Sequence, residues 1–203
     1  PPILAIGGLN FIDVYPISQF LNGGGGGDPP ELEFDRFNAE FIDEDYGTAI
    51  AVSGDGARLA AGSPRAFLGA QGVGQVQIYE VGGVQIGAEI IGLEANDLFG
   101  SAVTLSEDGL IVGVGGITGS SGAGYVRVFS QNGENWDQVG QTIVGRQPGD
   151  NLGKSLSISA DGQTVAIGAY QADAASGAGY VQIFGLVGTI WTQIGADIVG
   201  INN

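Results

Sequence analysis

A single pattern occurs three times in this chain at intervals of 53 residues. Each copy opens with a glycine, continues through alternating large apolar and small residues, and closes on an Asp-Gly pair followed by another glycine. A fixed period over three copies is typical of repeat architectures, in which a small unit must stack on its neighbours to bury its apolar surface. The repeated positions are Gly47, Asp55, Gly56 and Gly62; Gly100, Asp108, Gly109 and Gly115; and Gly153, Asp161, Gly162 and Gly168.

Each copy is predicted to form four short strands. Residues 48–53 place apolar side chains at every second position, which indicates a strand. The Asp-Gly pair favours a tight turn, because glycine adopts positive φ without steric cost and aspartate hydrogen-bonds its own turn. A second strand follows, then a loop of variable length, then a third strand such as residues 124–129. The fourth strand ends in an Ile/Val pair and glycine, as at residues 143–145.

Four antiparallel strands in about 50 residues are typical of one blade of a β-propeller. We therefore expect an all-β fold with β-propeller blades at residues 44–96, 97–149 and 150–203, after an N-terminal arm with a glycine-rich linker at residues 1–43. A solenoid is the second architecture to consider and a β-sandwich the third. Closed propellers have about four to eight blades. Three blades imply a longer parent protein, a propeller completed by oligomerisation, or an open array with capped edges.

The repeat resembles the FG-GAP repeat, the blade motif of integrin-α-like propellers, over residues 44–203. The FG position corresponds to Phe99-Gly100, with Tyr46-Gly47 and Leu152-Gly153 as variants. The GAP position corresponds to Gly62-Ser63-Pro64, to Gly168-Ala169-Tyr170 and, more weakly, to Gly115-Gly116-Ile117. An acidic residue precedes the first motif at a constant offset in every copy: Glu44, Asp97 and Asp150.

The chain departs from this family at the loop between the first two strands. Many FG-GAP blades bind calcium there in an Asp-x-Asp-x-Asp-Gly loop, and calcium needs six to eight oxygen ligands. In this chain the loop is shortened to residues 53–56, 106–109 and 159–162, with one or two carboxylates in each. We expect plain hairpins, with the calcium loop lost, no metal site and no cofactor. The calcium-dependent ligand binding of integrins is not carried over.

The composition limits the chemistry available to the chain. It has 22 acidic residues against 6 Lys and Arg, a net charge of −16, and neither His nor Cys. Nucleic-acid binding, which needs clustered cations, is not expected, and no apolar stretch is long enough for a membrane span. We predict no catalytic residue. Glu44, Asp97 and Asp150 recur as equivalents, whereas an active site needs one special position, so we expect them to cap backbone N–H groups between blades.

Two groups of aromatic residues are candidates for partner binding. Phe34, Phe37 and Phe41 lie in an acidic segment, either along one face of a helix or in an extended segment that docks on the first blade or on a partner. Trp136 and Trp191 recur before the fourth strand, and copy one has Gly83 there. They form either an aromatic platform for a glycan or partner, or a cover over the outer strand of their own blade.

From these observations we expect a non-enzymatic protein-interaction or structural module that is secreted or lies in an organelle lumen. One alternative is an accessory subunit of a larger assembly, tethered by its N-terminal arm. Another is a carbohydrate-binding or carbohydrate-active propeller. The expected partners are other protein chains, which include copies of itself and further blades of the parent protein.

Overall fold

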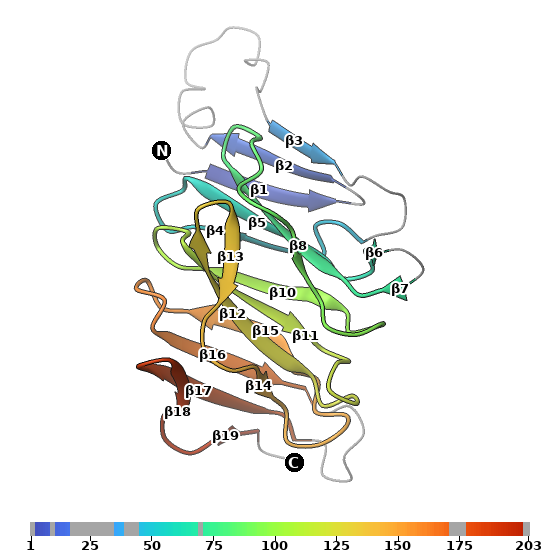
Figure 1. Cartoon of the computed structure of the whole chain (residues 1–203), viewed down its shortest axis with the longest axis vertical. Coiled ribbons are helices and arrows are strands. Elements are labelled where there is room, and N and C mark those ends of the chain that lie inside the picture. Colours follow the sequence, from blue (N-terminus) through green and yellow to red (C-terminus); the bar gives the residue numbers. More distant parts are fainter. Residues whose placement is uncertain are drawn as a thin grey trace, which may run out of the picture.

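Every regular element in the described part of the chain is a β-strand. The computed structural model describes residues 3–8, 11–16, 35–38, 45–68, 71–170 and 178–200. Three antiparallel sheets, one from each copy of the repeat, follow one another along the long axis (Figure 1). We call them blades 1, 2 and 3. The prediction of an all-β fold built from antiparallel, propeller-like sheets is confirmed.

The order of strands in each sheet follows the order in the chain. Blade 1 contains β4 (Ala49–Val52), β5 (Arg58–Ser63), β8 (Gln75–Glu80) and β9 (Ile90–Ile91), with the small pair β6 (Phe67–Leu68) and β7 (Gln71–Gly72) in its loop. Blade 2 contains β10 (Phe99–Leu105), β11 (Ile111–Gly116), β12 (Tyr125–Asn132), β13 (Asn135–Gln138) and β14 (Ile143–Val144). Blade 3 contains β15 (Leu152–Ile158), β16 (Thr164–Ala169), β17 (Tyr180–Val187), β18 (Ile190–Gln193) and β19 (Ile198–Val199).

The fourth strand differs from the prediction because it is divided into two parts. In blade 2, β13 pairs with the C-terminal half of β12 and β14 pairs with the N-terminal half of the same strand. Gly140, between the two parts, has φ of +71°. Positive φ interrupts the extended conformation and is accessible to glycine. Blade 3 repeats this arrangement around Gly195, which has φ of +73°.

Part of the segment predicted as an N-terminal arm forms another antiparallel sheet. It consists of β1 (Ile3–Gly8), β2 (Phe11–Pro16) and β3 (Asp35–Asn38), and β1 lies beside β4 of blade 1 (Figure 1). Phe37 lies in β3, so the backbone around it is extended and not helical. Phe34, Phe41 and Glu44 lie outside the described residues.

The chain enters each blade through the same backbone turn. Asp45, Leu98 and Asn151 are equivalent positions in the repeat and have φ of +53°, +52° and +50°. The FG-position glycines two residues later also have positive φ, between +79° and +94°. Glycine and, to a lesser degree, Asn and Asp tolerate this conformation. The repeat is therefore one of backbone conformation as well as of residue type.

The hydrophobic core lies mainly between neighbouring blades. One cluster joins blade 1 to blade 2 and includes Val76, Ile78, Phe99 and Val112, all fully buried. A second cluster joins blade 2 to blade 3 in the same way. Alternation along each strand sends one set of side chains toward the preceding blade and the other toward the following blade. Each blade thus needs a neighbour on both faces.

Glycine allows the blades to approach closely. A Cβ atom placed on Gly62 of blade 1 would lie 2.1 Å from the carbonyl oxygen of Gly100 in blade 2. A Cβ atom on Gly115 of blade 2 would lie 2.2 Å from the carbonyl oxygen of Gly153 in blade 3. The glycine of the GAP position in one blade therefore contacts the glycine of the FG position in the next, which explains why both recur.

Candidate interaction surface

The repeated aspartates are buried within the turns that lead into the blades. Asp97 is 1% exposed, and its carboxylate accepts hydrogen bonds from the backbone N–H groups of Leu93 and Glu94 at 3.0 and 2.8 Å. The Tyr125 hydroxyl donates to the same carboxylate at 2.6 Å. Burial, followed by this hydrogen bond, raises the pKa of Tyr125. Three donors on one carboxylate oxygen hold the turn in place.

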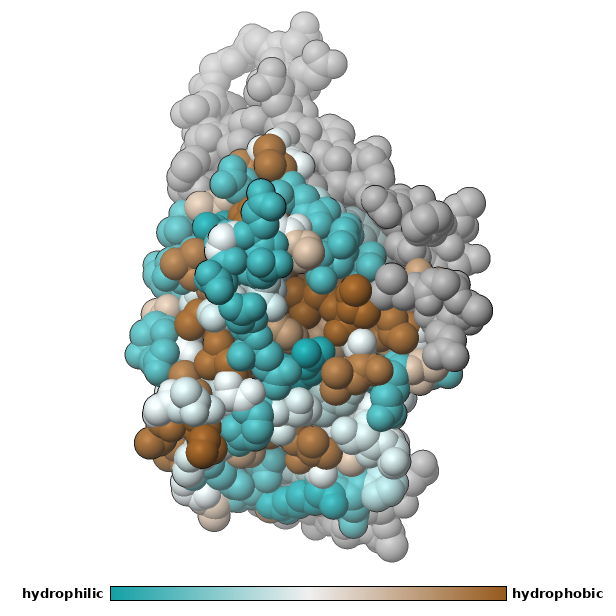
Figure 2. All heavy atoms as spheres, in the orientation of Figure 1, coloured by the Kyte–Doolittle hydropathy of each residue, from teal (hydrophilic) through white to brown (hydrophobic). Residues whose placement is uncertain are grey.

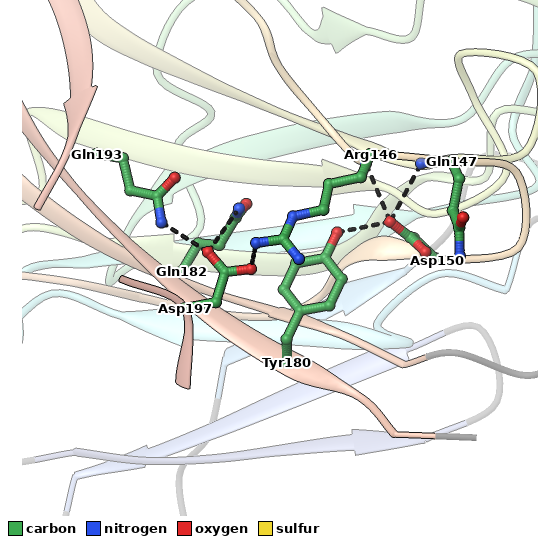
Figure 3. Close-up of polar contacts among 7 residues, drawn as sticks. All are labelled: Arg146, Gln147, Asp150, Tyr180, Gln182, Gln193 and Asp197. Atoms are coloured by element: carbon green, nitrogen blue, oxygen red, sulfur yellow. Dashed lines mark hydrogen bonds and ion pairs between the residues drawn. The ribbon is translucent and has the colours of Figure 1, made fainter. Parts of the chain in front are cut away.

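Asp150 makes the equivalent contacts in blade 3 (Figure 3). Its carboxylate accepts from the backbone N–H groups of Arg146 and Gln147 at 3.0 and 3.2 Å, and from the Tyr180 hydroxyl at 2.7 Å. Burial and the bond to Asp150 raise the pKa of Tyr180 to about 12. Backbone capping by the repeated acids is therefore present at Asp97 and Asp150.

A second polar network joins the two parts of the outer strand in blade 3. Arg146 forms an ion pair with Asp197, and its guanidinium lies 4.5 Å from the ring centre of Tyr180 (Figure 3). The other carboxylate oxygen of Asp197 accepts from the side-chain amides of Gln182 at 3.1 Å and Gln193 at 2.7 Å. No motif in the sequence marks Arg146 or Asp197, although glutamine recurs at the equivalent positions 85, 138 and 193.

The Asp-Gly hairpins are closed by hydrogen bonds of their own. In blade 2 the Ser106 hydroxyl and the Leu110 backbone N–H donate to the same oxygen of Asp108 at 2.7 and 3.0 Å. These two bonds hold the pKa of Asp108 below its usual value. Blades 1 and 3 repeat the pattern at Asp55 and Asp161. In the described part of the chain, no three acidic side chains gather as metal ligands would.

The two tryptophans lie between blades and do not form an open platform. Trp191 is 2% exposed, and its indole N–H donates to the carbonyl of Val139 in blade 2 at 2.8 Å. The indole N–H of Trp136 donates to the carbonyl of Ile86 in blade 1 at 3.1 Å. Each ring covers the outer strand of the preceding blade. The alternatives drawn from the sequence, a partner platform or a cover for the same blade, do not describe this arrangement.

Blade 3 exposes apolar positions that are buried in the other two blades. Val76 and Val126 are 0% exposed, whereas the equivalent Val181 is 37% exposed. Ile90 and Ile143 are 4% and 5% exposed, and their equivalent, Ile198, is 60% exposed. Figure 2 shows apolar side chains on the surface at the C-terminal end of the stack, over β17 and β18.

We call the surface of blade 3 that contains Val181 on β17 and Ile198 on β19 the trailing face. A shallow cavity of about 560 Å³ lies on it, lined in part by Ser155, Gly168, Tyr170, Val181 and Ile198. In blades 1 and 2 the corresponding face packs against the next blade. Exposed, contiguous apolar surface marks places where proteins bind one another. The trailing face is therefore the candidate interaction surface.

Comparisons with known proteins establish the fold but no family. No family model matches the chain, and no curated protein matches it. The structure of hydrazine synthase from Kuenenia stuttgartiensis aligns with a TM-score of 0.60 and 16% identity, over 97% of this chain and 46% of that one. A structure assigned as a 6-phosphogluconolactonase from Bacteroides uniformis aligns with a TM-score of 0.53 and 15% identity, over 94% and 55%.

The chain thus spans about half the length of these two β-propeller-like structures. At such low identity the likeness concerns the fold alone. No helix among the described residues is long and apolar enough to span a bilayer.

Proposed function

We propose that this chain is a structural and protein-interaction module of the β-propeller type, related to FG-GAP blades, which binds another β-sheet through its trailing face. The observation that carries the proposal is the exposure of Val181 and Ile198, whose equivalents in blades 1 and 2 are buried. Burying one such aliphatic side chain contributes about 1.5–3 kcal/mol. That value applies to a fully exposed side chain; because Val181 and Ile198 are 37% and 60% exposed, covering the face contributes a corresponding part of it.

The repeated polar residues support a role without catalysis. Asp97 and Asp150 are occupied by backbone and tyrosine donors, and Asp108 by its own hairpin. Their contacts stabilise turns and recur from blade to blade. We further propose a secreted or lumenal location, on the basis of the acidic composition and the resemblance to the blades of integrin-α-like propellers. Accessory binding within a larger assembly is compatible with the same surface.

The proposal is tested by placing charge on the trailing face. The double variant Val181→Asp/Ile198→Asp should lose binding of an apolar dye and any concentration-dependent association in sedimentation velocity. Its unfolding midpoint should fall far less than that of the buried-position control below, although the two new carboxylates would lie opposite each other across β17 and β19 and repel by about 0.2–1 kcal/mol. Val126→Asp, at the equivalent buried position, is the matched control and should unfold the chain.

Two results would contradict the proposal. If the double variant is destabilised as strongly as Val126→Asp, the trailing face is already covered within the chain. If dye binding and association are unchanged, the apolar surface responsible lies elsewhere. Val187 is exposed at the opposite end of β17, outside the cavity lining. Loss of dye binding in Val187→Asp would place the surface there.

A further inference from the structure

The two interfaces between blades share three specific contacts. The first is the approach of Gly62 to Gly100, repeated at Gly115 and Gly153. The second is a parallel bridge from the glycine before the third strand to the first residue of the next blade, Gly74 to Phe99 and Gly124 to Leu152. The third is the indole N–H bond to the preceding blade, described above. In each contact, one blade supplies a receiving group (Gly115, Gly124 or the Val139 carbonyl in blade 2), and the next blade supplies an inserting group (Gly153, Leu152 or Trp191 in blade 3).

The trailing face carries the receiving half of all three contacts. At Gly168, the three atoms nearest to an added Cβ atom all belong to Ser155 in its own blade. At Gly179 and Gly195, a Cβ atom would meet no other blade, whereas at Gly140 it would lie 2.6 Å from the Trp191 ring. Among the described residues, nothing from a further blade contacts these three glycines.

We propose that the trailing face is the seat of a fourth blade of the same repeat type, carried by the parent polypeptide. This inference rests on the proposed function and names its partner. The incoming blade needs a large apolar residue followed by glycine at the start of its first strand, so that its backbone fits against Gly168. It also needs a tryptophan in its outer strand, whose indole N–H donates to the carbonyl of Ile194, the equivalent of Val139.

The alternative occupant, a second copy of this chain, fits these requirements poorly. The first blade of a second copy has glycine, Gly83, at the position of the inserting tryptophan. The β1 strand also lies beside β4 on the side of blade 1 that would have to be inserted. The chain covers 46% and 55% of the two similar structures, so their chains extend well beyond the matched part. These three observations favour a further blade.

A cysteine accessibility experiment tests the seat. The chain contains no cysteine, so Val181→Cys places a single thiol on the trailing face. Residues 93–145, which include Asp97, Phe99-Gly100 and Trp136, are appended after Gly200, the position equivalent to Gly145. We expect the thiol in the extended chain to react about tenfold or more slowly than in the original chain, because a buried thiol reacts only after local opening. Val126→Cys, already buried, should react slowly in both chains.

Gly168→Val supplies the specific control. In the extended chain this substitution should restore fast labelling of Cys at position 181, because a side chain there blocks the backbone of the fourth blade. In the original chain it should slow labelling far less than the fourth blade does, because position 168 lies directly opposite position 181 and its side chain shields the thiol only in part. A second extension, residues 146–200 appended after Gly200, guards against an appended blade that fails to fold.

The outcomes separate the inference from the proposed function. If neither extension slows labelling, or if Gly168→Val has no effect on the slowed rate, the fourth-blade seat is overturned while binding of another protein stands. If labelling of the original chain already slows as its concentration rises, a second copy occupies the face, which also overturns the seat. If Val181→Cys is unreactive at every concentration, the face is covered and both proposals fail.

Discussion

Replacing Gly115 by alanine should destabilise the protein far more than the same change at Gly168. The new Cβ atom at position 115 would lie 2.2 Å from the Gly153 carbonyl oxygen, and ordinary van der Waals contact begins at 3.4 Å. The obstacle is backbone, so relief requires blades 2 and 3 to separate by about 1.2 Å, the difference of those distances. A gap of about 0.5–1 Å already forfeits a quarter to a half of the dispersion attraction between facing atoms.

The cost of that separation follows from the core between the blades. The affected cluster contains fully buried side chains from both sides, among them Val126, Leu152 and Ile167. Overpacking in such a core costs about 1–3 kcal/mol and occasionally more. Because the strain acts on the whole interface, we expect Gly115→Ala to lower the free energy of unfolding by about 3 kcal/mol.

Gly168→Ala is the matched comparison in blade 3. Its Cβ atom would lie 2.2 Å from the Ser155 Oγ atom, and the next nearest atom, Ser155 Cβ, is at 3.5 Å. A serine side chain on an exposed surface rotates away at little cost. Since φ at Gly168 is not positive, alanine also restricts the unfolded chain, which contributes about 0.4–1 kcal/mol of stability. Urea unfolding followed by circular dichroism measures both variants. Equal losses would refute the assignment of these glycines to blade contacts.

Three further predictions follow from single contacts. Leu98→Asn should raise the unfolding midpoint, because leucine at positive φ costs roughly 1–2 kcal/mol and the third copy already has Asn151 there; a lower midpoint would contradict this. Trp191→Phe should lose more than about 1 kcal/mol, because the hydrogen bond to the Val139 carbonyl contributes about that much and the smaller ring also leaves a cavity in the core; an unchanged urea midpoint would argue against the bond. The lowered pKa of Asp108 stabilises the fold above the unfolded value of about 4, and this contribution is lost as pH falls through the lower folded value. Ser106→Ala should weaken that acid dependence in a pH series of thermal melts.

Much of the fold could be predicted because each repeated residue meets a local requirement. Asp55, Asp108 and Asp161 sit in hairpins that short-range chemistry determines, and alternation in residues 48–53 is enough to indicate a strand. The capping role of Asp97 could also be expected, since an acidic residue just before a blade lies in the turn that connects it to the preceding blade.

Other features depend on contacts between blades, which the sequence does not display. The sequence predicts Trp191 to be a platform or a cover for its own blade, because spacing along the chain does not reveal that Val139 of the preceding blade accepts its N–H. The sequence predicts one outer strand here, because nothing in residues 139–142 shows that they leave the sheet and that Gly140 has positive φ. Arg146 and Asp197 are far apart in sequence, and their ion pair arises only when the turn folds over Tyr180.

The spacing of neighbouring sheets is fixed at two opposite edges. Along the first and second strands, glycine brings backbone against backbone, as at Gly115 and Gly153. Along the last strand, the indole of Trp191 is inserted between the sheets. A thin contact at one edge and a thick one at the other make each interface a wedge. The size of that wedge sets the angle by which successive sheets turn, and hence the number of sheets that would complete a circle.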